Sequence, residues 1–276
     1  MSGAQRPDTN IIMSTEIKEY WNQRAKQAAE SPTATTDDVH LRNLEVRTFV
    51  EAIQRLGLPD GSTVVDVGCG DGFTTLHVAE QLPKLKFAGV DYSEEMIATA
   101  HRRLADISAR LGSPVVFRVG DATALEGLFP AGSLDVVLTD RCLINLTSPE
   151  AQYDALGQIH ALLKPGGSHF AIENFTSGQE ALNQSRAALG LNEIPVRWHN
   201  LFFNEDDFLT KMRALHSKVE IVNFSSAYYY ATRVIYSKYC QMRGEVPDYQ
   251  HEIHQLAVQL PPMGAFSPIK LAILTK

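Results

Sequence analysis

The protein has 276 residues and a formal net charge of −7, from 25 Lys and Arg against 32 Asp and Glu. An acidic chain has no general attraction for phosphates, which argues against nucleic-acid or membrane partners. No apolar run reaches the ~18 residues that span a bilayer, and residues 1–10 lack the features of a signal peptide. Cys69, Cys142 and Cys240 form no CxxC pair, so no disulfide framework or zinc finger is expected, and a cytoplasmic location is favoured.

The first 60 residues predict a loose tail and two helices. Residues 1–13 show no hydrophobic period, whereas residues 14–30 place apolar side chains at helical spacing. A polar stretch at 31–38 separates this helix from a second one, which ends at the turn 59–61. Residues 14–60 are therefore expected to form an N-terminal helical cap.

From residue 61 the pattern changes to short apolar runs that alternate with amphipathic helices, so residues 61–276 are expected to form the main domain. Most of the runs are apolar on both faces, as in parallel strands covered by helices on each side. Repeated β-α units at this spacing predict a doubly wound open α/β sheet. Five such runs are predicted strands: 63–67, 86–91, 115–119, 134–139 and 168–173.

The last hundred residues are less regular. Two further strands are predicted near 219–224 and at 270–275. Insertions near 175–218 and 225–268, after the fifth and sixth strands, are long enough to enclose a small molecule and are expected to bind it.

The most informative segment is 64–72, where a buried strand runs into a glycine-rich turn followed by a helix. Glycines let the backbone approach a ligand closely. Phe73 stands where a dinucleotide-binding fingerprint would have its third glycine, and the spacing is Gly-x-Gly-x-Gly instead. Asp66, two residues before the first glycine, suits an ammonium group better than a pyrophosphate.

Two more carboxylates follow the next two predicted strands. Asp91 can accept hydrogen bonds from both hydroxyls of a ribose, and Asp121 can meet the exocyclic amine of adenine. An amino-acid group, a ribose and an adenine in one cleft describe S-adenosylmethionine.

These segments resemble the class I S-adenosylmethionine-dependent methyltransferases, of the type that acts on small molecules. The resemblance covers about residues 60–175 and implies a Rossmann-like, seven-stranded, mostly parallel sheet whose last strand is antiparallel. It is carried by segments 64–72, 87–93, 120–122, 134–138 and 162–167.

The resemblance also implies roles for individual residues. Gly68, Gly70 and Gly72 would contact the methionine part of the donor, Asp91 the ribose, and Tyr92, Met96, Asp121 and Ala122 the adenine. Asp66 and Thr139 are added to this cofactor-binding set, and Tyr20 and Trp21 are expected to close a lid over the donor unless they are simply helix packing.

The acceptor site is expected beyond the fourth and fifth strands. Arg141 is a candidate to bind a carboxylate or phosphate, with a surface ion pair as the equal alternative. The other substrate-binding candidates are Asn145, Asn183, Arg186, Asn200, Tyr229 and Arg233. By contrast, Arg42 and Glu45, one helical turn apart, are expected to be a surface pair.

His199, in a predicted loop, is the candidate general base, because imidazole titrates near neutral pH. Glu173 and Arg141 complete the catalytic set. Asp140, Glu173 and Asn174 are similar to the oxygen-rich magnesium site of catechol O-methyltransferases, but their spacing is not a clean match, so an unassisted mechanism without metal is favoured.

The sequence therefore predicts methyl transfer from S-adenosylmethionine to an oxygen or nitrogen of a small polar metabolite. Methylation of RNA or protein is one alternative, disfavoured by low basicity. A non-catalytic binding module is another, disfavoured by the intact donor motifs. A homodimer is left open.

Overall fold

The computed structural model describes residues 9–28, 31 and 35–276, with residues 9–12 and 28 described by their backbone alone. Seven strands form one sheet in the order β3-β2-β1-β4-β5-β7-β6, and only β7 runs antiparallel to its neighbours β5 and β6. This confirms the expected seven-stranded topology. The strands are β1 (Thr63–Val67), β2 (Lys86–Asp91), β3 (Val115–Val119), β4 (Leu134–Asp140), β5 (Leu163–Asn174), β6 (Lys218–Val222) and β7 (Ile269–Thr275).

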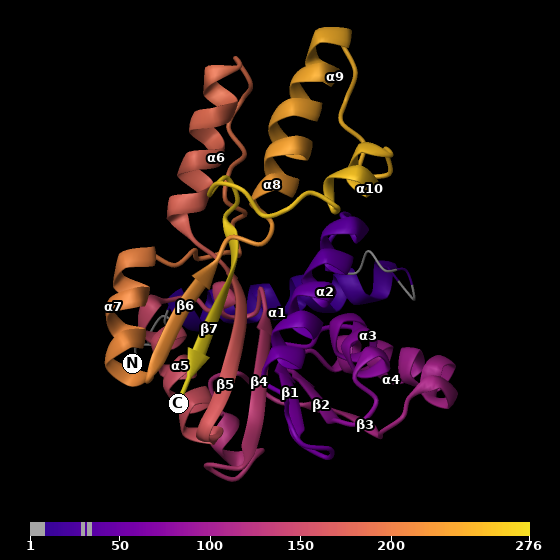
Figure 1. The fold of residues 1–276 in the computed structure, drawn as a ribbon, viewed down its shortest axis with the longest axis vertical. Coiled ribbons are helices and arrows are strands. Elements are labelled where there is room, and N and C mark those ends of the chain that lie inside the picture. Colours follow the sequence, from indigo (N-terminus) through magenta and orange to yellow (C-terminus); the bar gives the residue numbers. More distant parts are fainter. Residues whose placement is uncertain (1–8, 29–30, 32–34) are drawn as a thin grey trace, which may run out of the picture.

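Helices cover both faces of the sheet (Figure 1). Strand residues alternate between two apolar clusters, one shared with α2, α3 and α4 and the other with α5 and α7, which is why the strand runs are apolar throughout. The α-helices are α1 (Thr9–Ala28), α2 (Val39–Arg55), α3 (Phe73–Gln81), α4 (Glu94–Ile107), α5 (Pro149–Leu162), α6 (Thr176–Ala188), α7 (Glu205–Leu215), α8 (Ser226–Tyr229), α9 (Ser237–Arg243) and α10 (Ile253–Ala257).

The expected tail is too long, because helix α1 already begins at Thr9 and residues 9–13 are helical. No glycine or proline lies between Thr9 and Ala28, so nothing in the sequence stops the helix from extending toward Pro7. Residues 1–8 of the predicted tail lie outside the described part of the chain.

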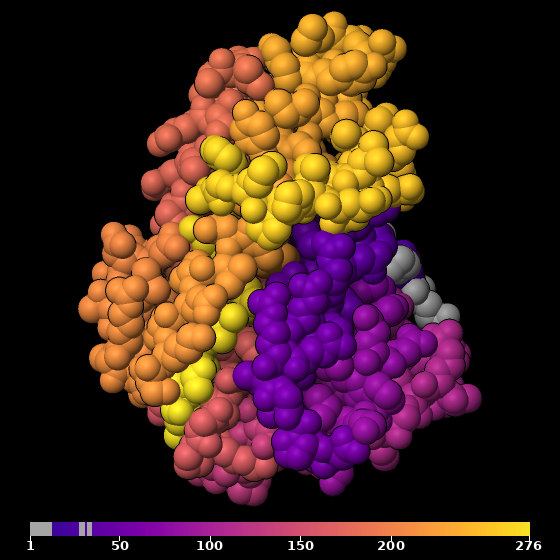
Figure 2. All heavy atoms as spheres, viewed as in Figure 1, coloured from indigo at the N-terminus to yellow at the C-terminus, as the bar shows by residue number. Residues whose placement is uncertain are grey.

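The segments after β5 and β6 rise together beyond the sheet. Helices α6, α8, α9 and α10 stand above the carboxyl ends of the strands in Figure 1, and Figure 2 shows the late segment lying on α2. Arg47 on α2 donates a hydrogen bond of 2.7 Å to the carbonyl of Val258. The hydroxyl of Tyr228 donates one of 2.6 Å to Asp38, the N-cap of α2. The N-terminal helices and the late insertion thus meet over one edge of the sheet.

Within the described residues, no helix combines the length and the apolar character needed to cross a bilayer.

Candidate functional site

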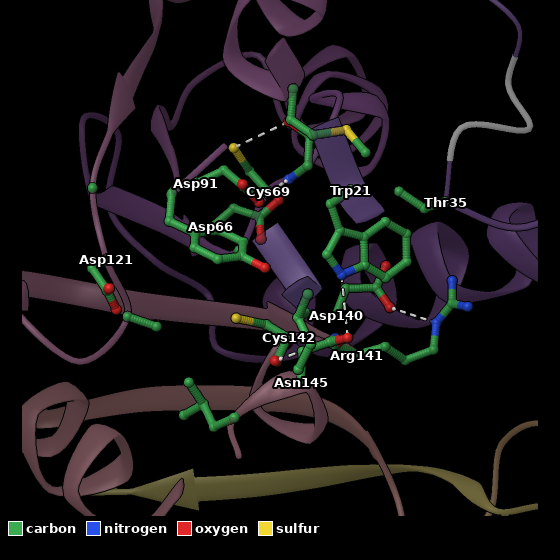
Figure 3. A pocket seen from close by; sticks show the side chains of 18 of the residues that line it. Trp21, Thr35, Asp66, Cys69, Asp91, Asp121, Asp140, Arg141, Cys142 and Asn145 are labelled. Carbon is green, nitrogen blue, oxygen red and sulfur yellow. Dashed lines mark hydrogen bonds and ion pairs between the residues drawn. The ribbon is translucent and has the colours of Figure 1, made fainter. Parts of the chain in front are cut away.

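A first cavity of about 200 Å³ opens at the carboxyl ends of β1, β2 and β4 (Figure 3). Strand order reverses between β1 and β4, and in doubly wound sheets such a switch point leaves a crevice that binds ligands. The loops after these strands form its floor, and Ile17 and Trp21 of α1 line its other side.

The glycine-rich loop after β1 shapes one wall of the first cavity. Gly68 and Gly70 line it with φ of 75° and 53°, left-handed values that disfavour a side chain. Asp66 is 1% exposed, and its Oδ2 accepts a 2.6 Å hydrogen bond from the Thr75 hydroxyl. Its Oδ1 has no hydrogen-bond partner in the described chain, and burial raises the pKa of Asp66 to about 7. A buried carboxylate oxygen left without a partner suits a cationic ligand group.

Asp91 joins two loops at the same wall. Its Oδ2 accepts from the backbone N–H of Gly70 and its Oδ1 from that of Ser93, both at 2.9 Å. Burial raises the pKa of Asp91 to about 6, although these two hydrogen bonds oppose the shift. Each oxygen keeps further acceptor capacity beside the cavity, as recognition of paired hydroxyls requires.

The other end of the first cavity is lined by Tyr92, Met96, Asp121 and Ala122. The Tyr92 hydroxyl is buried without a hydrogen-bond partner in the part of the chain that is described. Asp121 holds its loop by accepting from the backbone and the hydroxyl of Thr123, at 2.8 and 2.7 Å. A lining of apolar side chains that includes a carboxylate suits an adenine ring.

A wall of polar side chains closes the first cavity at the end opposite Asp121 (Figure 3). The indole of Trp21 donates to Asn145 Oδ1 at 3.3 Å, and Asn145 in turn donates to the carbonyl of Arg141 at 2.8 Å. Among the described residues, Arg141 is the only non-glycine with positive φ, at 53°. Its guanidinium pairs with Glu45 of α2 at 3.0 Å.

The expected surface pair of Arg42 and Glu45 is therefore wrong. Arg42 is 3% exposed and bonds Asp71 at 2.8 Å, while Glu45 is fully buried against Arg141. Helical spacing brings the two residues to one face, but that face packs on the sheet, where each finds an opposite charge from another element. Burial raises the pKa of Glu45 to about 8 despite the neighbouring guanidinium.

A second cavity, of about 280 Å³, lies on the other side of this wall. The two cavities share four lining residues: Trp21, Thr35, Arg141 and Asn145. Most of the other residues that line the second cavity come from residues 36–41, the end of β5, the loop at 194–202 and the helical insertion near Tyr229 and Arg233.

His199 lines the second cavity and is 5% exposed. Its ring stacks on Tyr20 with centroids 4.7 Å apart and meets the edges of Trp21 and Trp198. Burial, and secondarily the charge of Arg197, lowers the pKa of His199 to about 4, so the ring is neutral near pH 7. Its Nδ1 has no hydrogen-bond partner in the described chain.

Comparison with known proteins agrees with this geometry. A methyltransferase-domain family model matches residues 64–167. Demethylmenaquinone methyltransferases of Lactococcus lactis and Symbiobacterium thermophilum are 33% and 32% identical, over 45% and 41% of this chain. Residues 64–167 are therefore similar to a methyltransferase domain. The chain spans less than half of those two relatives, 46% and 43% of their lengths.

The methyltransferase fold extends beyond the matched region. Magnesium protoporphyrin IX methyltransferase of Synechocystis PCC 6803, with bound SAH, superposes with a TM-score of 0.60 over 95% of this chain and 99% of that one, at 15% identity. The SpnF [4+2]-cyclase superposes with a TM-score of 0.53 at 22% identity, over 83% of this chain and 79% of that one. These likenesses concern the fold alone.

Most residues predicted to bind the cofactor line the first cavity: Trp21, Asp66, Gly68, Gly70, Asp91, Tyr92, Met96, Asp121 and Ala122. Gly72 and Thr139 do not line either cavity. A Cβ on Gly72 would lie 2.8 Å from the Phe117 ring, so this glycine permits packing of the core. Thr139 is fully buried and contacts His169 at 3.1 Å. Tyr20 lines neither cavity and supports His199 by stacking.

Of the predicted acceptor residues, Arg141, Asn145, Asn200, Tyr229 and Arg233 line the second cavity, together with His199. Asn183 and Arg186 do not. Asn183 exchanges two hydrogen bonds with the backbone of Ile194, and Arg186 donates to the carbonyls of Asn192 and Arg233. Polar side chains in an irregular insertion are here used to fix its backbone.

Glu173 lines neither cavity. Its carboxylate accepts from the backbone N–H groups of Leu143 and Ile144, at 3.1 and 3.3 Å, and thereby fixes the turn after β4. No cluster of three or more His, Cys, Asp or Glu side chains suited to a metal occurs in the described residues. Glu173 therefore supports the site through the turn after β4 and does not line a cavity.

The site also contains Thr35, which the sequence analysis did not assign to it and which lines both cavities. Asp140 and Asn174 were considered from the sequence only as parts of a magnesium site. Asp140 lines the first cavity and accepts from the Thr74 hydroxyl at 2.9 Å, and Asn174 lines the second. Both residues end strands, β4 and β5, and this position is the signal that drew attention to them. Glu45 gives no such signal, because its burial depends on how α2 packs.

Proposed function

We propose that this protein transfers a methyl group from S-adenosylmethionine in the first cavity to an oxygen or nitrogen of a small polar molecule in the second. The observation that carries this proposal is the shared wall of Trp21, Thr35, Arg141 and Asn145. Methyl transfer is an in-line displacement, so donor and acceptor must meet at one boundary from which water is excluded.

The residues of the first cavity fit the donor. Asp66 offers an unpartnered buried oxygen to the donor's ammonium group, and Asp91 offers acceptors to a ribose. When bound, S-adenosylmethionine supplies an electrophilic methyl group on a positively charged sulfur. The chain itself orients the two molecules, and helix α1 covers the cavity with Ile17 and Trp21.

His199 is the proposed proton acceptor for a hydroxyl or neutral amine substrate. The ring is neutral near pH 7 and its Nδ1 is unpartnered in the described chain, so it can receive a proton. Because its pKa is low, the proton is best transferred late, when the acceptor atom is already becoming positive.

A small molecule fits the second cavity better than RNA or protein. The cavity is bounded by the N-terminal segment and both insertions, and the net charge of −7 gives no attraction for a polyanion. Relatives are named for different acceptors, including demethylmenaquinone, trans-aconitate and ajmaline, so their names do not define one substrate.

Calorimetric titration with S-adenosylmethionine, followed by an assay for S-adenosylhomocysteine release over a broad acceptor panel, tests the proposal. Stoichiometric binding with acceptor-dependent release is expected. Binding without release on any acceptor would favour a non-catalytic module, and absence of binding would refute the proposal.

A further inference from the structure

The second cavity contains one charge that the described protein leaves without an opposite charge. Arg197 lines the cavity, and no described residue forms an ion pair with it. The other charged side chains that line this cavity are each paired: Asp37 with Arg24, Asp38 with Arg233, and Arg141 with Glu45.

Arg197 is an exposed residue that lines the cavity beside a tight turn. The carbonyl of Arg197 accepts from the backbone N–H of Asn200 at 3.0 Å, and the N–H of Leu201 docks on the carbonyl of Ile144 at 2.6 Å. The turn brings Arg197, His199 and Asn200 to the same cavity. After burial, the charge of Arg197 is the next cause of the lowered pKa of His199, so its field reaches that ring.

The second cavity is also lined by two residues that have buried atoms without hydrogen-bond partners in the described chain. Asn174 ends β5, is 7% exposed and lines the cavity, yet its Oδ1 has no hydrogen-bond partner in the part of the chain described. His199 Nδ1 is likewise buried and has no hydrogen-bond partner among the described residues. Buried polar atoms are rarely left unsatisfied, so a ligand that donates a hydrogen to them is expected.

We propose, building on the function proposed above, that the acceptor carries a carboxylate that binds Arg197 and a hydroxyl or amino group that donates to Asn174 or His199. In the transfer, the carbon–sulfur bond of the donor breaks and a carbon–oxygen or carbon–nitrogen bond forms. The proton of that group leaves to His199 or water, and the sulfonium becomes a neutral thioether.

The charges of the cavity favour a carboxylate over other anions and over a neutral acceptor. A guanidinium matches a carboxylate in charge and in its two-pronged geometry. A phosphate dianion would leave one negative charge unmatched. Arg141 and Arg233 are less suited to this role, because Asp140, at 3.6 Å, and Asp38 already pair with them.

The test uses the full chain saturated with S-adenosylhomocysteine and ligand-observed NMR binding of matched probes. The probes are hydroxybenzoates and hydroxycinnamates, each with its primary amide, and a hydroxyphenyl phosphate. The same hydroxy acids are assayed for methyl transfer from radiolabelled S-adenosylmethionine. The variant is Arg197→Gln, and the control is Arg213→Gln, an exposed arginine of α7 that lines neither cavity.

At least one hydroxy acid is expected to bind ten times more tightly than its amide and its phosphate, and to be methylated. Arg197→Gln should weaken that binding at least tenfold, leave amide binding unchanged and alter donor affinity less than twofold. Equal binding of acids and amides, no hydroxy acid bound by a protein that binds donor, or equal behaviour of the two variants would overturn the inference. A protein that binds no donor would instead overturn the proposed function.

Discussion

Asp91 performs two tasks with one carboxylate. Its two oxygens tie the glycine-rich loop after β1 to the start of α4 through Gly70 and Ser93. Their remaining acceptor capacity faces the first cavity. The residue therefore both shapes the cavity and offers hydrogen-bond acceptors to a ligand.

Asp91→Asn is expected to weaken the binding of S-adenosylhomocysteine at least tenfold. The substitution removes a charged acceptor, and hydrogen bonds to charged groups are worth about 1.5–3 kcal/mol. Calorimetry on the folded variant measures the change. Asp106→Asn, at an exposed position of α4, is the matched control, and equal affinity in the two variants would remove Asp91 from the proposed donor site.

His199→Ala is expected to lower kcat about 100-fold once an acceptor is in hand, with donor affinity changed less than twofold. Since the pKa of His199 lies at about 4, the basic ring persists above about pH 5, and the wild-type rate should not fall through loss of this base between pH 6 and 8. His216→Ala is the control: this histidine also has a pKa lowered to about 4 but lines neither cavity. Equal rates in the two variants would exclude His199 as the base.

At the scale of elements, the residues that follow β4 form part of the wall between the two cavities. Arg141 follows the last residue of that strand, and its backbone N–H donates to the carbonyl of Ile172 in β5 at 2.7 Å. Glu45 from α2 fixes the guanidinium, and Asn145 bonds the carbonyl. A non-glycine residue in the left-handed region costs about 1–2 kcal/mol, which these contacts must offset.

Arg141→Gly should therefore be more stable than Arg141→Ala, by about 1 kcal/mol, the reverse of the usual order. Both variants remove the guanidinium and leave Glu45 without this partner, so the comparison isolates the backbone. Urea denaturation of the two proteins measures the difference. An alanine variant as stable as the glycine variant would show that the turn is not strained.

The elements themselves were largely predictable, because a strand apolar on both faces is recognisable from its own residues. The second cavity was less so, since it is assembled from segments near residues 36, 174, 199 and 233 that meet only through tertiary packing. The same limit explains why Asn183 was wrongly placed in the acceptor site. Its side chain exchanges hydrogen bonds with the backbone of Ile194 and lines neither cavity. The strand ends Asp66, Asp91 and Asp121 were identifiable because sheet topology brings them to one edge.

At the scale of the whole molecule, burial shifts the pKa values of carboxyls and of histidines in opposite directions. Burial raises the pKa of four carboxyls and lowers the pKa of five histidines. The carboxyls are Glu45 (about 8), Asp66 (about 7), Glu173 (about 7) and Asp91 (about 6). The histidines are His169 (about 3), His199, His216 and His254 (each about 4), and His160, whose pKa is lowered as well.

The cytoplasmic location, the lack of a nucleic-acid partner and a possible homodimer are predictions from the sequence alone.

The donor-free protein is expected to lose roughly 1–3 kcal/mol of unfolding free energy between pH 6.5 and pH 8. A carboxyl whose pKa is raised by folding stabilises the fold below its unfolded pKa, and this stabilisation is lost as pH rises through the folded value. The histidines have the opposite effect near pH 6.5, where about half of each unfolded imidazole is still protonated. This opposing slope fades toward pH 8, so the carboxyls determine the net loss. Urea denaturation at the two pH values measures the loss.

Glu45→Gln, which cannot ionise, should flatten that pH dependence. Glu205→Gln should not, because Glu205 lies in a partly buried ion pair with Lys270 and its pKa is lowered. Stability that is constant or rises between the two pH values in the wild type would contradict the assignment of these carboxyls.

A crystal structure with S-adenosylhomocysteine bound tests the arrangement of donor and acceptor most directly. We expect adenine beside Asp121, ribose hydroxyls on Asp91, and the sulfur directed at the wall formed by Trp21, Arg141 and Asn145, facing the second cavity. A sulfur that points away from this wall, or a first cavity that takes up no adenosyl compound, would contradict this expectation.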